Sequence, residues 1–314
     1  MLFKFYSIVI FMVDEKYLKA GKIAAEVREE SKKLIEPGAR LLDIAEAIEK
    51  LINNKGADMA FPVNLSINEI AAHYTPLKND TVFLKETDII KVDIGVHIDG
   101  YIGDTAYSIS LDKSKEDLVK ASELALENAI KLCKPETKVS EIGHVIRDTI
   151  ESRGFNPITN LTGHGLERFD LHAKPSIPNI PVGTEILKQD QVIAIEPFAT
   201  DGKGFVKDSG SIMIYTLVAP APVRSETARE VIKLVADRQR LPFTERWFNF
   251  TPIKLRLGLH ELRQRGVLYD YPMLREESGK FVSQAEHTVI VGEEPIVTTE
   301  FVKKIDEEQN EKHK

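Results

Sequence analysis

The chain has 314 residues, 42% of them hydrophobic, which is enough apolar material for one large domain with its own core. Its formal net charge of −7 at pH 7 argues against a protein that binds nucleic acid through its overall charge, so no specific nucleic acid is expected as a partner. The single cysteine, Cys133, excludes an internal disulfide framework and favours a reducing, cytoplasmic setting. Cys133 falls in a helical pattern, and we interpret it as a small buried apolar residue.

Residues 1–13 form an N-terminal extension whose apolar run is too short to span a bilayer. The run also lacks the small-residue cleavage site of a signal peptide, so no membrane association is expected. Two interpretations stay open: an additional strand or interface segment, or a start-site artefact with translation beginning at Met12. The regular helical pattern that begins at Asp14 favours the second.

Hydrophobic periodicity and stops at Gly or Pro predict four helices, at residues 14–35, 41–55, 114–132 and 139–154. A capping box of Ser114 and Asp117 is expected to start the third helix. The tail after Val302 is rich in Lys and Glu and is expected to be frayed.

The second pair of helices belongs to an internal repeat. "PGARLLDIAEAIEKLINNKG" (37–56) aligns without a gap on "PETKVSEIGHVIRDTIESRG" (135–154). "HYTP" at His73 recurs as "HAKP" at His172, and "LKETDIIKVDI" aligns on "LKQDQVIAIEP", which places Asp93 over Glu196. The pattern predicts an α+β fold of two similar α-α-β halves that face each other, each with a carboxylate and a histidine.

The stretch "KVDIGVHIDGYIGD" (91–104) predicts a β-hairpin with an Asp-Gly turn. In that register Gly95 faces Asp104, and Asp93 lies on the same face as a diagonal neighbour of Asp104. We expect Gly95 to leave room beside the two carboxylates. Two carboxylates this close do not both stay ionised without a cation, so a metal site competes with a surface pair and with a pair that shares one proton.

Three further residues favour the metal site. His164 lies between glycines in "LTGHGLE", where little bulk would crowd an ion, and Glu196 and Glu286 lie in the apolar runs "VIAIEPF" and "FVSQAEHTVIV". Buried carboxylates in strands need compensation. Four carboxylates and one imidazole would balance two divalent cations, and oxygen-rich ligation suits Mn²⁺, Fe²⁺ or Co²⁺, with Zn²⁺ also compatible.

These five residues, and the ordered motifs "DIGVHIDGYIGDTA", "TGHG", "IEPF" and "EHT", resemble the dimetal site of the pita-bread metallopeptidases. Within them, residues 14–302 resemble the type II methionine aminopeptidases of archaeal and eukaryotic kind. Ala285, where a bulky residue is frequent, departs from the pattern. The resemblance implies a pita-bread catalytic domain of residues 14–219 and 276–314, interrupted by a winged-helix-like insert of residues 220–275.

The resemblance also implies metal-dependent removal of the N-terminal methionine from nascent polypeptides, by a hydroxide between two ions that attacks the first peptide bond. Asp104 and Glu286 would bridge the ions, Asp93 would bind one ion, and His164 with Glu196 would bind the other. Glu196 would also take up a proton of the water. His73 and His172 would flank the scissile bond as catalytic residues, and the methionine pocket would contain Phe61, Pro62, Leu171, Phe198 and Tyr271. His287 follows Glu286 in a strand, points the other way and is interpreted as packing.

The insert carries 11 Lys and Arg against 6 Asp and Glu from Val223 to Arg275, a net charge of +5. We expect short helices followed by a small hairpin, and interpret the insert as a wall of the cleft, with docking to a ribosome or RNA as the alternative. Two other functions remain open. One is an Xaa-Pro aminopeptidase or dipeptidase of the same fold, which usually carries a large preceding domain. The other is a non-catalytic relative that binds a ribosome or RNA.

Overall fold

The structure is a computed structural model and describes residues 13–219 and 221–302. The predictions for residues 1–12 and for the tail after Val302 lie outside this range. Within the described residues, no helix is long and apolar enough to cross a bilayer.

The four predicted helices of the repeat are confirmed with small shifts at their ends. Asp14 caps the first helix by accepting a hydrogen bond from the Lys16 amide at 2.9 Å. The capping box is wrong: Ser114 lies in a 3₁₀ turn, η2 (Lys113–Lys115), where Asp112 accepts from its amide, and the third helix starts after that turn. The bounds are α1 (Glu15–Ser31), with a 3₁₀ turn η1 (Lys32–Leu34), α2 (Leu41–Asn54), α3 (Glu116–Ile130) and α4 (Val139–Ser152).

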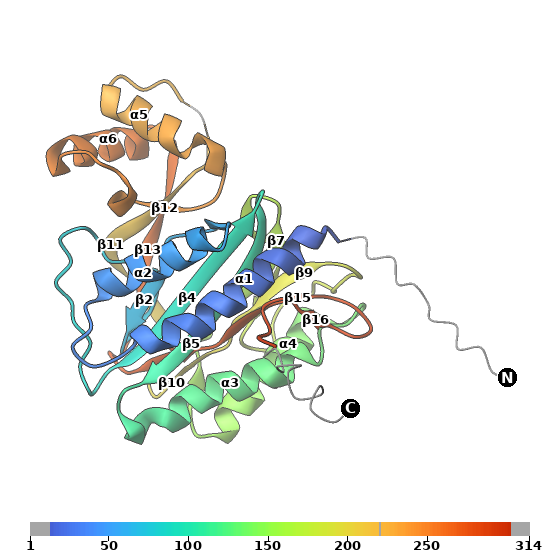
Figure 1. Cartoon of the computed structure of the whole chain (residues 1–314). Helices are drawn as coiled ribbons and strands as arrows, with labels where there is room; N and C mark the ends of the chain where they lie inside the picture. Colours follow the sequence, from blue (N-terminus) through green and yellow to red (C-terminus); the bar gives the residue numbers. More distant parts are fainter. Residues whose placement is uncertain (1–12, 220, 303–314) are drawn as a thin grey trace, which may run out of the picture.

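A nine-stranded antiparallel sheet forms the centre of the molecule (Figure 1). Its order is β1-β4-β5-β15-β9-β7-β8, with β2 on β4 and β16 on β15. The bounds are β1 (Asp58–Met59), β2 (Asn64–Ile67), β4 (Ile89–Ile98), β5 (Tyr101–Ser110), β7 (Thr162–Glu167), β8 (Asp170–Pro178), β9 (Val192–Ile195), β15 (Glu286–Ile290) and β16 (Ile296–Val297).

Helices α1 to α4 cover one face of this sheet, and α1 runs diagonally across β4 and β5 (Figure 1). Val92 and Ile94 of β4 pack in one buried cluster with residues of α1 and α2, whereas Ile193 and Ile195 of β9 pack in a second cluster with α3 and α4. Since side chains alternate across a strand, Asp93 points to the opposite face. The helices therefore bury one face of the sheet, and the other face is left for the polar residues.

The predicted hairpin between β4 and β5 is confirmed in its register. Gly95 pairs with Asp104, and Asp93 pairs with Ala106. Asp99 and Gly100 have φ values of 50° and 87°. Positive φ at both turn residues is the requirement of a type I′ turn, which Asp-Gly satisfies at low cost.

The internal repeat is also visible in the backbone hydrogen bonds. Ahead of α2, the Gly38 amide donates to the Leu84 carbonyl at 2.8 Å, and ahead of α4, the Glu136 amide donates to the Leu187 carbonyl at 2.9 Å. These pairs correspond in the sequence alignment of the two halves. Local sequence similarity therefore reflects a repeated tertiary arrangement.

The expected small hairpin within the insert is wrong. The segment after the last helix is one nine-residue strand, β13 (Leu268–Glu276), which pairs with β11 (Val206–Leu217) ahead of the insert and with β3 (Ile70–Ala72). Helices α5 and α6 lie at one end of the molecule (Figure 1). The other elements here are β12 (Phe243–Thr244), on β11, and α5 (Glu226–Val235), η3 (Ala236–Arg238), η4 (Glu245–Trp247) and α6 (Pro252–Gln264).

A buried ion pair ties the insert to the first half. The Arg246 guanidinium donates to both carboxylate oxygens of Glu49 on α2, at 2.5 and 2.8 Å, and the Trp247 indole donates to the same carboxylate at 3.0 Å.

A small three-stranded sheet, β14-β10-β6, completes the fold. The domain boundaries and the winged-helix likeness remain predictions. The bounds of the small sheet are β6 (Asn156–Pro157), β10 (Phe198–Thr200) and β14 (Val282–Gln284).

Candidate metal centre

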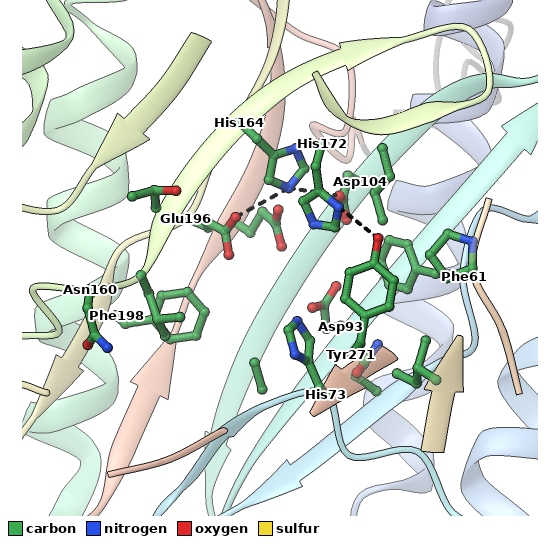
Figure 2. A pocket seen from close by; sticks show the side chains of 18 residues that line it. Phe61, His73, Asp93, Asp104, Asn160, His164, His172, Glu196, Phe198 and Tyr271 are labelled. Atoms are coloured by element: carbon green, nitrogen blue, oxygen red, sulfur yellow. Dashed lines mark hydrogen bonds and ion pairs between the residues drawn. The ribbon is translucent and has the colours of Figure 1, made fainter. Parts of the chain in front are cut away.

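Five neighbouring strands of the large sheet each bring one predicted metal ligand to a single cavity of about 200 Å³. Because the strand order is β4-β5-β15-β9-β7, residues far apart in sequence become neighbours. Figure 2 shows that the labelled side chains among them point toward one another. The ligands, in strand order, are Asp93, Asp104, Glu286, Glu196 just after β9, and His164.

The distances between these groups suit a shared cation. One ligand atom from each of Asp104, His164 and Glu286 lies within 4.8 Å of the others. His164 Nε2 lies 3.4 Å from Glu196 Oε1 and 4.0 Å from Asp104 Oδ2. These separations are too long for good hydrogen bonds. A divalent ion that lies between the groups could instead be coordinated by all of them.

The surroundings of His164 favour the neutral ring with Nε2 unprotonated, which is the form that binds a metal. Its Nδ1 lies 3.3 Å from the Gly165 carbonyl, which can only accept, so Nδ1 carries the proton and Nε2 keeps its lone pair. Burial lowers the pKa of His164 to about 4, so the ring is neutral at pH 7. A second hydrogen bond of this kind orients the ring of many metal-binding histidines.

The carboxyl groups show that the cavity lacks compensation for negative charge. Burial raises the pKa of Asp93 to about 7, and burial and the neighbouring carboxylates raise the pKa values of Asp104, Glu196 and Glu286 well above their usual range. Oδ1 of Asp93 and Oδ1 of Asp104 are buried without a hydrogen-bond partner among the described residues. Cations would supply both the missing charge and the missing partners, so the residues fit divalent metal.

His73 and His172 lie on the same cavity with Tyr271 (Figure 2). His73 Nδ1 lies 3.0 Å from the Pro272 carbonyl, so Nδ1 donates and Nε2 is left as an acceptor in the neutral ring. His172 Nδ1 lies 3.3 Å from the Tyr271 hydroxyl. His73 has φ of 65°, a strained backbone conformation that is frequent at functional sites. Burial lowers the pKa of His73. His172 is more exposed to solvent, and the protein packed around its ring, with His164 and His73 nearby, lowers its pKa as well.

Of the predicted methionine-pocket residues, Phe61, Leu171, Phe198 and Tyr271 line the cavity, and Pro62 does not. The prediction that Gly95 leaves open room is wrong. A Cβ built at Gly95 would lie 2.2 Å from the Phe61 ring, so Phe61 already fills that space. The absence of a side chain at Gly95 therefore lets the Phe61 ring pack against the strand and form part of the cavity wall. It does not leave space for an ion.

The interpretation of the glycines beside His164 is also wrong. A Cβ on Gly163 would lie 2.2 Å from the Ala194 carbonyl oxygen, and a Cβ on Gly165 would lie 2.2 Å from the Lys174 carbonyl oxygen. Both glycines permit close approach of the neighbouring backbone. They position the His164 strand in the sheet without enlarging the cavity for an ion.

Several site residues escaped the sequence analysis. Gln284 Nε2 donates to Glu286 Oε2 at 3.3 Å, a contact that the spacing of two residues in a strand could have suggested. Asn64 lines the cavity and pairs in register with Asp93. Leu161 and Thr162 lie in the segment "LTGHGLE" around His164, and Ala72 precedes His73, so their neighbours could have suggested them. The other lining residues carry no signal in the sequence: Asn160, Ile214 and Pro242.

The chain is similar in sequence to known metallopeptidases. The family described as Metallopeptidase family M24 matches residues 15–221. The chain is 48% identical to the methionine aminopeptidase of Pyrococcus abyssi (strain GE5 / Orsay), over 91% of this chain and 98% of that protein. It is 50% identical to the methionine aminopeptidase of Thermococcus onnurineus (strain NA1), over 89% of this chain and 97% of the relative.

Solved structures with a similar fold confirm the pita-bread architecture. Methionine aminopeptidase from Thermotoga maritima superposes with a TM-score of 0.66 at 26% identity, over 91% of this chain and 96% of that chain. A thermophilic Arx1 superposes with a TM-score of 0.81 at 19% identity, over 90% and 89% of the two chains. Prolidase from Pyrococcus furiosus gives 0.58 at 17% identity, over 92% and 64%. The last two likenesses concern the fold alone.

Proposed function

Because the chain belongs to metallopeptidase family M24, we propose that it removes the N-terminal methionine from polypeptides. Archaeal methionine aminopeptidases that are 48% and 50% identical to this chain support the substrate. The observation that carries the chemistry is the convergence on one cavity of a neutral imidazole and four carboxyl groups, of which Asp104 and Glu286 are buried and Asp93 and Glu196 half-buried. The substrate class is therefore polypeptide N-termini.

We assign two divalent ions to the five ligands, drawn from Co²⁺, Mn²⁺, Fe²⁺ or Zn²⁺. Asp104 and Glu286 lie on adjacent strands, between Asp93 on one side and Glu196 and His164 on the other, so these two carboxylates would help to hold both ions. When bound, the ions supply Lewis acidity that acidifies a water molecule and polarises the scissile carbonyl. Glu196, whose Oε1 lies 3.4 Å from His164 Nε2, is placed to take up a proton from that water.

The two histidines take complementary roles on the scissile peptide group. The Tyr271 phenol, whose pKa burial raises, stays protonated, and its oxygen lies 3.3 Å from His172 Nδ1. We assign the phenol as the donor of this contact, which would leave His172 Nε2–H free to donate to the carbonyl oxygen. His73 donates through Nδ1 to Pro272, so its Nε2 accepts from the amide N–H of the substrate. One ring thus stabilises developing negative charge, and the other holds the leaving amide in place.

The apolar wall of the cavity fits the methionine side chain. Phe61, Leu171 and Phe198 are buried, and the whole cavity measures about 200 Å³. An unbranched, polarisable thioether adapts well to such a narrow aromatic and aliphatic space. We infer that these residues select methionine and that the same limits restrict the residue that follows it. A cytoplasmic location, and contact of the basic insert with a ribosome, stay predictions.

The assay that tests this function separates methionine release from proline-directed hydrolysis. The full chain, stripped of metal with a chelator and reloaded with Mn²⁺ or Co²⁺, is given Met-Ala-Ser and, separately, Xaa-Pro dipeptides. We expect methionine release that depends on the added ion and no cleavage of Xaa-Pro. Cleavage of Xaa-Pro alone would replace the proposed function by that of a prolidase. Lack of hydrolysis in every metal would exclude a peptidase.

A further inference from the structure

Asp104 and Glu286 lie on neighbouring strands, β5 and β15, and a side chain of the opposite strand holds each of them. The Thr288 hydroxyl on β15 accepts from the Asp104 amide at 2.7 Å and donates to the Asp104 carbonyl at 2.8 Å. The Thr105 hydroxyl on β5 donates to the Glu286 carbonyl at 2.9 Å. The two contacts cross between the strands, and we call Thr105 and Thr288 the crossed threonines.

Both crossed threonines are fully buried and are themselves held from behind. Arg28 of α1 donates from Nη1 to the Thr105 hydroxyl at 2.7 Å. The Thr299 hydroxyl accepts from the Thr288 amide at 3.1 Å. These partners lie on the helix-covered side of the sheet, with His287, whose Nδ1 lies 2.7 Å from Thr299 Oγ1. The predicted packing role of His287 agrees with this placement.

The register shows why a side chain is needed at this point. Regular pairing joins Glu286 to Ala106 and His287 to Thr105. At Asp104, the Thr288 hydroxyl takes the amide and the carbonyl that a regular ladder would pair with backbone. The spacing of the two strands at Asp104 therefore depends on the length of a threonine side chain, and so does the separation of the Asp104 and Glu286 carboxylates.

We infer that the crossed threonines are positioning residues that set the Asp104–Glu286 spacing before metal binds. This inference rests on the proposed function, because it treats these two carboxylates as bridging ligands. Neighbouring carboxylates in a buried cavity disfavour each other's charged form, so a fixed backbone is needed to keep both at the spacing that binds a cation. Groups that orient metal ligands from behind typically change metal affinity by about 10- to 100-fold when they are removed.

The test compares Thr288→Val with a matched control, Thr200→Val. Thr200 is also fully buried, and its hydroxyl also donates to one carbonyl, that of Phe281 at 2.6 Å, and accepts from one amide, that of Gly202 at 2.9 Å. Both variants lose the same two kinds of hydrogen bond, and only Thr288 touches a ligand. Mn²⁺ affinity of the metal-free full chain is measured by calorimetry, and melting temperature is measured without metal.

We expect comparable falls in melting temperature, with the dissociation constant for Mn²⁺ raised about 10- to 100-fold in Thr288→Val alone. Thr288→Ser keeps the hydroxyl and should bind Mn²⁺ like the wild type. If Thr288→Val does not fold, Thr105→Val, which loses the contact to the Glu286 carbonyl, should show the same loss of affinity. Wild-type affinity in the folded threonine variants, or an equal loss in Thr200→Val, overturns the inference. A wild-type chain that binds no divalent ion refutes the proposed function instead.

Discussion

The two halves of the repeat use the same scaffold, yet their paired histidines contact different groups at Nδ1. His73, in the first half, donates from Nδ1 to the Pro272 carbonyl, whereas His172, in the second half, has its Nδ1 3.3 Å from the Tyr271 hydroxyl, which we assign as the donor. Both partners belong to β13, a strand outside the repeat. The difference shows that a pseudo-symmetric scaffold gains distinct chemical roles from one non-repeated element laid between its halves.

The proposed metal ligands also differ between the halves. The first half contributes two carboxylates on one hairpin, Asp93 and Asp104, while the second half contributes His164 on β7 and Glu196 at the end of β9. Glu286, on a strand that follows the insert, lies between them in the sheet. The centre therefore exists only when both halves and the final strand have assembled.

The largest expected effect comes from removing the ligand at the junction of the halves. Asp104→Asn should lower kcat/KM for Met-Ala-Ser on the order of 10³-fold or more, because the ions lose a ligand that stabilises the transition state. The metal-free protein should melt at the same or a higher temperature, since burial and the neighbouring Asp93 raise the pKa of Asp104, and the neutral amide removes a charge that is costly in the empty cavity. Unchanged peptide hydrolysis would refute the metal assignment.

A smaller effect should distinguish the two histidines. Tyr271→Phe removes only the donor to His172 and should lower kcat about 10-fold with little change in KM. His172→Ala should lower kcat about 10²-fold, and adding Tyr271→Phe to it should cost little more, because the phenol acts through that ring. His73→Ala combined with Tyr271→Phe should instead be additive. Steady-state kinetics of the single and double variants measure this, and additivity in both pairs would contradict the assigned polarity.

The smallest effect concerns stability and a histidine of the first half alone. Burial, with a smaller contribution from Arg238, lowers the pKa of His97 to about 4, and its Nδ1 accepts from the Gly100 amide at 3.1 Å. Between pH 6.5 and 4, His97 is protonated in the unfolded chain and neutral in the folded chain. The free energy of unfolding therefore falls as the pH falls through this window. The loss amounts to at most about 3.5 kcal/mol, since one unit of pKa corresponds to about 1.4 kcal/mol.

His97→Asn retains an acceptor for the Gly100 amide and cannot titrate. Urea unfolding at pH 7 and at pH 4 should show a smaller loss of stability in the variant than in the wild type. The other buried histidines titrate in both proteins, and their contributions cancel in the difference. Equal acid sensitivity would show that the His97 ring accepts a proton without cost in the folded state.

Local patterns in the sequence determined much of this protein. The helix periodicity, the Asp99–Gly100 turn and the strand alternation around Asp93 depend on neighbouring residues, and the structure confirms each of them. The repeat could be found because helix stripes and acidic positions recur at matching spacing. The carboxylates among the five proposed ligands could be named because a carboxylate inside an apolar strand is costly unless a partner compensates its charge. All five could be named because their motifs resemble those of a known family.

Only the tertiary structure decided which distant segments meet. Gly95 accommodates the Phe61 ring, the glycines beside His164 admit neighbouring backbones, and β13 pairs with both β11 and the distant β3. None of these contacts is local, so no period or spacing in the sequence reports them. Propensity and alternation act over a few residues, whereas hydrogen-bond polarity and cavity shape depend on atoms from segments as far apart in the chain as His73 and Pro272.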